Sequence, residues 1–164
     1  MKNYFKISLG IFVALAASRF LPHPPNFTSL IALGFYVPAL LGLRFIPAII
    51  LSFAITDFFI GFHYYILFTW GSIVLIGLIP KCLFGTITKR LSGALIGSVL
   101  FFVVTNFGVW TSGLYEYTFE GLIYCYTLAL PFFAYNIIST FIFSAVIETL
   151  LKFKFFEFFS KSIK

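Results

Sequence analysis

The chain contains six long apolar runs, separated by short breaks that hold charged residues or prolines. The runs cover about residues 5–20, 28–43, 45–62, 64–80, 92–110 and 121–150. A helix needs roughly 20 apolar residues to cross the hydrocarbon core of a bilayer. The runs are continuous, whereas a membrane β-strand alternates polar and apolar residues over about ten positions. We therefore expect an all-α integral membrane protein, built as a six-transmembrane-helix bundle.

The charged residues are too few for a water-soluble protein of this length. Of the 164 residues, 61% are hydrophobic, and only 11 Lys or Arg and 5 Asp or Glu are present. A soluble domain usually has about 25% charged residues. The composition therefore excludes a soluble enzyme, a nucleic-acid-binding protein and a disordered chain as descriptions of the whole protein.

The positions of the basic residues predict the orientation of the helices. With the N-terminus in the cytoplasm, ten of the eleven fall on the inner side: Lys2, Lys6, Arg44, Lys81, Lys89, Arg90, Lys152, Lys154, Lys161 and Lys164. Only Arg19 falls on the outer side. Cytoplasmic loops carry an excess of Lys and Arg, so six helices with both termini in the cytoplasm fit best.

The N-terminal segment allows a second interpretation. It begins with Lys2 and Lys6 and continues as an apolar stretch from Ile7. The sequence Ala-Leu-Ala at 14–16 then resembles the cleavage site of a signal peptide. Cleavage would leave five helices and an outer N-terminus. We favour the uncleaved form, because the residues that follow carry a motif that belongs with an intact first helix.

We expect one domain over residues 1–164, since no linker or internal repeat is visible. Residues 152–164 mix Phe with Lys at short spacing. This pattern predicts a basic amphipathic cytoplasmic tail on the anionic inner face of the membrane. Glu148, near the end of the last apolar run, is expected to pair with a lysine of this tail.

The first outer loop is stiff and polar. Its sequence PHPPNFT at 22–28 contains three prolines, which fix φ and reduce the freedom that the loop would lose on binding. His23 and Asn26, with Arg19 just before the loop, supply hydrogen-bonding groups. A simple connector would not need such a loop, so we expect it to bind or cover a ligand.

Asp57 is the only acidic residue well inside an apolar run. A charge there is expensive and normally faces a cavity, a partner or a proton path. Its position in the outer half favours an ion pair with Arg19 at a ligand pocket; a structural pair without a ligand is the alternative. Asp57 with His23 and His63 is also a candidate metal site, but outer-loop histidines are more typical as hydrogen-bonding groups, and we expect no metal.

The other polar groups of the outer half lie in the last two runs. An amide in hydrocarbon needs partners, whereas Trp and Tyr also suit the interfacial aromatic belt. The candidate substrate-binding residues are Arg19, His23, Asn26, Asp57, His63, Asn106, Trp110 and Tyr126.

Three small residues, Gly10, Ala14 and Ser18, recur at a spacing of four in the first run. Small residues on one helix face let another helix approach closely. This face either packs within the bundle or docks a separate membrane subunit.

Several motifs together resemble a known kind of protein. They are PHPPNFT at 22–28, Asp57 with GFH at 61–63, Gly97-Ser98 with Phe101-Phe102 and TNFGVW at 105–110, Gly121-Leu122 with Cys125-Tyr126, and PFF at 131–133. Over nearly the whole chain they are similar to an uncharacterised bacterial family of transport proteins. That family is similar to the substrate-binding S components of energy-coupling factor (ECF) vitamin transporters.

The resemblance implies an S-component-like protein of the bacterial cytoplasmic (inner) membrane, with both termini inside and a substrate pocket that opens outward. S components dock a shared transmembrane coupling subunit, driven by two ATPases, through small residues of the first helix. Gly10, Ala14 and Ser18 fit that role loosely.

We therefore predict a substrate-binding subunit for uptake of a small nutrient, such as a vitamin or precursor. Its partners would be the small-molecule substrate, the lipid bilayer and a coupling subunit with its ATPases; no nucleic acid and no cofactor are expected. No Walker A loop, metal set or nucleophile–base pair indicates an enzyme. The alternative is a membrane scaffold of cell-envelope assembly, in which inner loops such as 81–90 make the contacts and no ligand binds.

Overall fold

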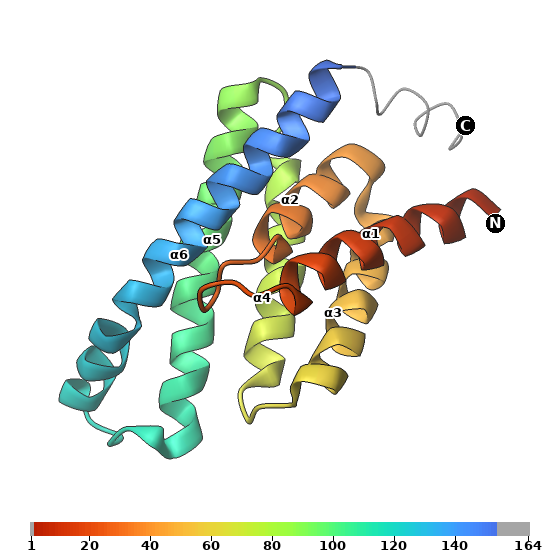
Figure 1. The fold of residues 1–164 in the computed structure, drawn as a ribbon. Coiled ribbons are helices and arrows are strands. Elements are labelled where there is room, and N and C mark those ends of the chain that lie inside the picture. Colours follow the sequence, from red (N-terminus) through yellow and green to blue (C-terminus); the bar gives the residue numbers. More distant parts are fainter. Residues whose placement is uncertain (1, 154–164) are drawn as a thin grey trace.

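Figure 1 shows the fold in a computed structural model, which describes residues 2–153. The described residues form six α-helices and no strand: α1 (Lys2–Phe20), α2 (Leu30–Leu41), α3 (Ile46–Ile60), α4 (Ile66–Leu78), α5 (Ile87–Val109) and α6 (Phe119–Lys152). A π-helical turn, Trp110–Leu114, extends α5. The all-helical prediction is confirmed for this part of the chain, while the predicted tail falls largely outside the described residues.

Three helical stretches are long and apolar enough to cross a membrane by length and composition: Leu43–Ile60, Ile87–Leu114 and Phe119–Lys152. Two apolar helical stretches are shorter, Leu30–Leu41 and Ile66–Lys81. With its 12 residues, α2 is about 18 Å long, which is less than the roughly 30 Å of a hydrocarbon core. A crossing by each of the six helices therefore stays a prediction.

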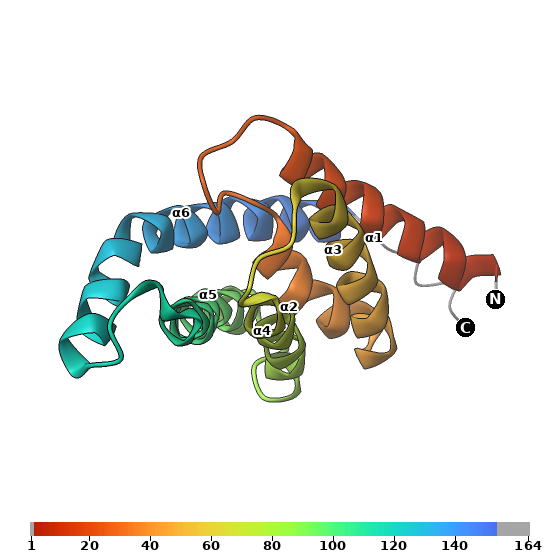
Figure 2. The ribbon, with the colours of Figure 1, turned by 90° about the horizontal axis from the view of Figure 1, so that it is seen from below.

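Helix α2 lies at the centre of the bundle. It contacts all five other helices, and Figure 2 shows it between α4 and α5 below, α6 above, and α1 and α3 to one side. It has no charged residue, and eight of its 12 residues are buried. A helix that is apolar on all sides is stable only where other elements cover it, which explains the central position of this short segment.

The connections between helices lie at the two ends of the bundle (Figure 1). The α2–α3 and α4–α5 connections lie at the end where α6 finishes, whereas the α3–α4 and α5–α6 connections lie at the opposite end. The first end holds the basic residues Arg44, Lys81, Lys89 and Lys152, and the second holds the acidic Glu116 and Glu120. The described loops therefore differ in charge between the two ends, as the predicted orientation requires.

Many large apolar side chains are exposed on the described surface, whereas many serine and threonine side chains are buried. Phe59 is 71% exposed and Leu67 76%, whereas Ser72, Ser98 and Thr140 are fully buried. Ser98 of α5 donates a hydrogen bond of 2.9 Å to Thr140 of α6. A water-soluble domain rarely exposes so much apolar surface, but helix bundles in lipid use small polar residues at their interfaces. The distribution is compatible with a membrane protein.

Glycines allow α5 to pack closely on its neighbours. A Cβ at Gly93 would overlap the ring of Phe35 in α2, and one at Gly97 would lie 3.2 Å from Ile76 of α4. Small residues four positions apart let helix backbones approach. Gly93 and Gly97, four residues apart on α5, therefore allow the close helix packing inside this bundle. The sequence pattern alone did not indicate this pair.

The small-residue face of α1 points away from the bundle. The buried residues of α1 are Ile7, Ile11 and Leu15. Gly10 and Ala14 are exposed, and a Cβ at Gly10 would meet no atom within 4 Å. Ser18 instead faces the start of α2, where its hydroxyl lies 2.7 Å from that of Ser29. Internal packing therefore does not account for Gly10 and Ala14, and their docking role stays a prediction.

Candidate functional site

A cavity of about 530 Å³ lies between the end of α1, the α1–α2 loop, and parts of α3, α4, α5 and α6. This volume falls within the roughly 300–1,000 Å³ of small-molecule sites. Its polar lining consists of Arg19, His23, Asn26, Thr28, His63, Tyr65, Thr69, Thr105, Asn106, Tyr115 and Asn136. Five predicted site residues are thereby brought together from three distant segments: Arg19, His23, Asn26, His63 and Asn106.

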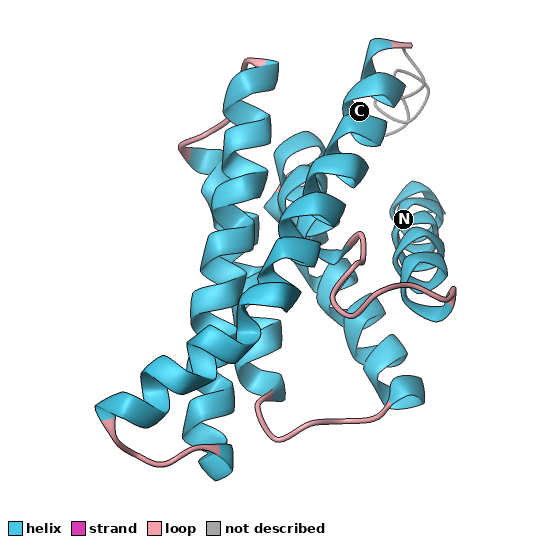
Figure 3. Cartoon of the chain, turned by 60° about the vertical axis from the view of Figure 1, so that its left-hand side comes forward, coloured by secondary structure: helices cyan, strands magenta, loops and turns pink. Residues whose placement is uncertain are grey.

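The proline-rich α1–α2 loop forms one wall of the cavity. Figure 3 shows the loop running between α1 and α6. A turn inside it is closed by the amide of Phe27, which donates to the carbonyl of Pro24 at 3.0 Å. Asn26 has a φ of 63°, a left-handed conformation that Asn adopts more readily than most residues. The ring of Phe27 packs 6.3 Å from that of Phe143, so the loop is docked on α6 over the cavity.

The predicted ion pair between Arg19 and Asp57 is confirmed. Nη2 of Arg19 lies 2.7 Å from Oδ1 of Asp57, and the two side chains are 13% and 2% exposed. Nη1 of Arg19 also donates to the hydroxyl of Thr56 at 2.7 Å, and the guanidinium lies 4.5 Å over the ring of Phe53. Arg19 therefore reaches the cavity wall as one half of a neutral pair, while Asp57 itself lies behind the wall.

Trp70 is a second partner of Asp57. Its Nε1 donates to Oδ2 of the carboxylate at 2.8 Å, so both carboxylate oxygens are engaged. The sequence contains a signal for this contact: a buried indole N–H needs an acceptor, and Asp57 is the one carboxylate deep in an apolar run. The signal was missed because Trp70 also fits an ordinary apolar helix.

Two side-chain amides face the cavity from α5 and α6. Nδ2 of Asn106 donates to the carbonyl of Phe102 at 2.7 Å, while its Oδ1 has no partner among the described residues. Asn136 is 5% exposed, and its side-chain amide makes no hydrogen bond to any described residue. Its amide atoms are not among the fully enclosed, unbonded side-chain atoms of the described residues, so they are reachable from the cavity and free to bond to a ligand.

Aromatic rings form a large part of the apolar lining, beside aliphatic side chains such as Leu30, Ile31 and Leu128; the rings are those of Phe53, Phe101, Phe102, Phe132 and Phe133. The rings of Phe102 and Phe133 stack with their centroids 4.5 Å apart. The cavity thus combines an apolar lining, in part aromatic, with a smaller number of polar side chains. This combination is typical of sites for small organic ligands.

His63 lies in the α3–α4 loop and contributes a ring to the cavity. Its Nε2 is 3.4 Å from the hydroxyl of Thr69, and its ring centroid is 4.1 Å from that of Tyr65. Burial lowers the pKa of His63 below its usual 6.5, with Asp57 opposing the shift and Arg19 adding to it. The neutral ring can donate or accept one hydrogen bond. Within residues 2–153, no three His, Cys, Asp or Glu side chains lie close enough to hold a metal ion.

Besides Asp57, two predicted site residues do not line the cavity: Trp110 and Tyr126. Nε1 of Trp110 donates to the carbonyl of Glu116 at 2.9 Å, and the hydroxyl of Tyr126 donates to the carbonyl of Val103 at 2.6 Å. Both polar atoms therefore have backbone partners, and these residues hold α5 and the start of α6 together.

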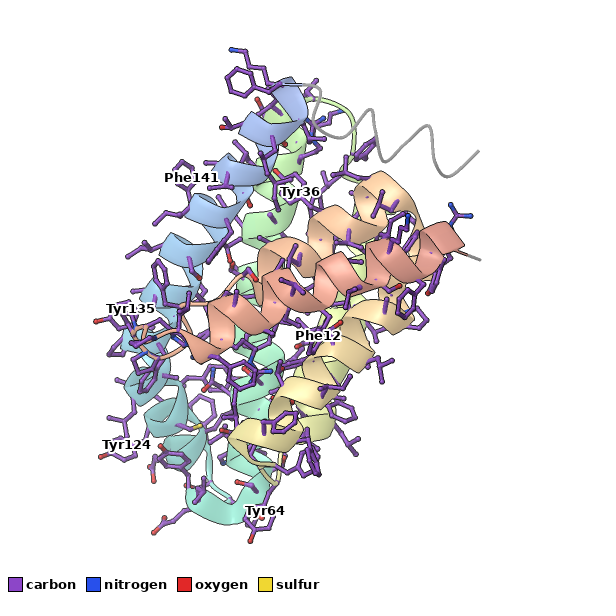
Figure 4. The ribbon with its side chains drawn as sticks, turned by 45° about the vertical axis from the view of Figure 1, so that its right-hand side comes forward. Phe12, Tyr36, Tyr64, Tyr124, Tyr135 and Phe141 are labelled. Carbon is purple, nitrogen blue, oxygen red and sulfur yellow. The ribbon has the colours of Figure 1, made fainter. Side chains whose placement is uncertain are left out.

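A second buried ion pair joins Arg90 and Glu148. Nη2 of Arg90 lies 2.6 Å from Oε2 of Glu148, and the hydroxyl of Tyr36 donates to Oε1 at 2.8 Å. Among the described residues the charged partner of Glu148 is therefore Arg90, in the first turn of α5, which reaches it because α5 and α6 pack side by side. Three of the four tail lysines predicted as partners, Lys154, Lys161 and Lys164, lie outside the described residues. Figure 4 shows Tyr36 in the upper half of the bundle and Tyr64 of the α3–α4 loop at the bottom. Neither Tyr36 nor the ion pair lines the cavity.

The described residues thus form an all-helical protein with three helices long and apolar enough to span a membrane and a partly open cavity of ligand size. Over residues 1–160 the chain matches a family of unknown function, DUF6580, and it belongs to this family. No curated protein matches the chain, and no solved structure does. The cavity therefore has to carry the functional argument.

Proposed function

We propose that the protein is a membrane transport protein of the bacterial cytoplasmic membrane: a substrate-binding subunit for uptake of a small nutrient, such as a vitamin or precursor. The observation that carries this proposal is the cavity of about 530 Å³ with a polar lining, inside a chain whose surface is apolar. Polar groups in a membrane bundle are costly and mark binding sites or transport paths.

The proposed orientation has six crossings with both termini in the cytoplasm. The basic loops at one end of the bundle support it, because Lys and Arg gather on the cytoplasmic side. The α3–α4 loop, which brings His63 to the cavity, lies at the opposite end. In this orientation the cavity belongs to the outer half of the protein and takes its ligand from outside.

The proposed mechanism has three steps. The ligand enters beneath the α1–α2 loop, the loop closes over it, and the protein then reorients with a coupling subunit. The resemblance to ECF S components supports such a partner, and the exposed Gly10 and Ala14 of α1 offer a surface that another helix can approach closely. The energy would come from the ATPases of the partner.

The proposal is tested by a thermal-shift screen of the purified full chain against vitamins and their precursors. A ligand stabilises the folded protein by RT ln(1 + [L]/Kd), so a compound that binds the cavity raises the melting temperature. The shift should be lost in Asn106→Ala. It should persist in Thr127→Ala, a control on α6 whose exposed hydroxyl bonds only within its own helix.

The scaffold alternative predicts the opposite results. In that case no compound would raise the melting temperature. Substitutions in the inner loop at 81–90 would instead abolish the co-purification of protein partners with the detergent-extracted protein. A screen without hits, or a hit that binds Asn106→Ala as tightly as the unchanged protein, would reject the cavity as a substrate site.

A further inference from the structure

The lining of the cavity indicates the chemistry of its ligand. We propose that the cavity binds an uncharged, planar molecule that carries a hydrogen-bond donor and an acceptor side by side on one edge. Carboxamides, lactams and nucleobases are molecules of this class. This inference rests on the proposed function and adds the substrate class to it.

The charges around the cavity favour an uncharged ligand. Arg19 is the lining residue with a permanent charge, and its guanidinium already pairs with Asp57 at 2.7 Å. The carboxylate is in turn occupied by Trp70 at 2.8 Å. A buried ion without a partner is strongly disfavoured. An anionic ligand would find no free cation in this pair, and a cationic ligand would find no free carboxylate.

The side-chain amide of Asn136 is free to bond to a ligand. This side chain is 5% exposed and lines the cavity, and no described residue bonds to its amide. A side-chain amide presents a carbonyl acceptor beside an N–H donor. Its best partner is therefore an edge with the reverse order, as when Asn pairs with adenine through two hydrogen bonds. The unpaired Oδ1 of Asn106 offers one further acceptor.

The phenylalanine rings in the apolar lining favour a planar ligand. Phe102 and Phe133 stack at 4.5 Å on the wall formed by α5 and α6, the same two helices that carry the two amides. Flat rings bind planar ligands by stacking. Phe133 and Asn136 are three residues apart on α6 and therefore lie on the same helix face, and both line the cavity. A planar ligand packed against this wall can reach the amide with its edge.

The test compares pairs of compounds that share a ring system and differ in charge: nicotinamide with nicotinate, riboflavin with riboflavin phosphate, and adenosine with adenosine monophosphate. Affinities are measured by isothermal titration with the purified full chain. In any pair that binds, the uncharged member should bind at least about tenfold more tightly, because the charged one pays a desolvation cost without a partner.

The role of Asn136 is tested with Asn136→Leu, which keeps the size of the side chain and removes both polar atoms. Affinity for the uncharged ligand should fall by about tenfold or more, because the ligand edge then loses two hydrogen bonds. Tyr36→Phe is the matched control: it removes a hydrogen bond of 2.8 Å to Glu148 at a residue that does not line the cavity, and it should leave the affinity unchanged. Melting temperatures of both variants show that they are folded.

The outcomes separate this inference from the proposed function. A charged member that binds as tightly as its uncharged counterpart, or a ligand that binds Asn136→Leu unchanged, overturns the inference and leaves a substrate-binding protein. A charged hit from the wider vitamin screen does the same. If no compound in either set binds, the proposed function and the inference fall together.

Discussion

The guanidinium of Arg19, at the end of α1, lies 2.7 Å from the carboxylate of Asp57 in α3. This contact ties the obliquely placed first helix to the rest of the bundle. It also removes the net charge of Arg19 from the wall of the cavity. One ion pair therefore links α1 to α3 and neutralises the charge of Arg19 at the cavity.

Breaking this pair should destabilise the protein. Asp57→Asn leaves the guanidinium of Arg19 buried without a counter-ion, which typically costs about 3–5 kcal/mol. Chemical denaturation in detergent measures the loss. The double variant Arg19→Leu with Asp57→Leu should lose less than Asp57→Asn alone, because neither charge is then buried unpaired. A double variant that is less stable than Asp57→Asn would show that the pair has no such role.

Substitution of Gly93 should disturb the packing of α5 on α2. In Gly93→Ala the new Cβ would overlap the ring of Phe35, and overpacking of this kind costs about 1–3 kcal/mol. Gly71→Ala is the matched control in α4, because a Cβ there meets no atom within 4 Å, and Ala is the better helix former by about 0.5–1 kcal/mol. The melting temperature should fall in the first variant and stay level or rise in the second. Equal shifts would refute the packing argument.

The half-buried ring of His63 should make stability depend on pH. Burial lowers the pKa of His63 from 6.5, so the unfolded chain takes up this proton at a higher pH than the folded protein. The contribution of His63 is therefore complete above pH 6.5 and is lost as the pH falls below that value. Melting temperatures from about pH 8 to pH 5 should fall less in His63→Gln than in the unchanged protein. Parallel curves would contradict the assignment.

Two cysteine positions test the orientation of the bundle. Cys82 is exposed in the α4–α5 connection, whereas Cys125 is buried. A membrane-impermeant maleimide should therefore label Cys82 only after the membrane is opened. In Tyr64→Cys, with Cys82→Ser, the reagent should label intact spheroplasts, because Tyr64 is 99% exposed in the α3–α4 loop. Labelling of Cys82 from outside would reverse the orientation.

The helices and the ion pair at the cavity could be predicted from the sequence, because they depend on strong local signals. Six continuous apolar runs predict helices, and a carboxylate deep in such a run needs a cation. Arg19 was the one basic residue expected on its side, so the pair followed. Scarcity of charge therefore made the pairing predictable.

Other features depend on rotation and packing, which the sequence pattern leaves open. Asn136 and Tyr126 lie on the same helix, and only the fold shows that the first faces the cavity while the second bonds to the carbonyl of Val103. Glu148 had several lysines nearby in sequence, yet its partner is Arg90 of another helix. The aromatic walls were equally hidden, because Phe suits both lipid and a binding site.

We propose that the cavity is the substrate site of an uptake protein. The most direct test measures accumulation of radiolabelled nicotinamide, riboflavin and adenosine, together with the hits of the vitamin screen, in cells of the source organism that lack the gene. Cells complemented with the unchanged gene should accumulate at least one compound. Cells with equal membrane levels of Asn106→Ala, which alters the cavity lining, should accumulate about tenfold less of it. Equal accumulation in both, or in cells without the gene, would contradict the account.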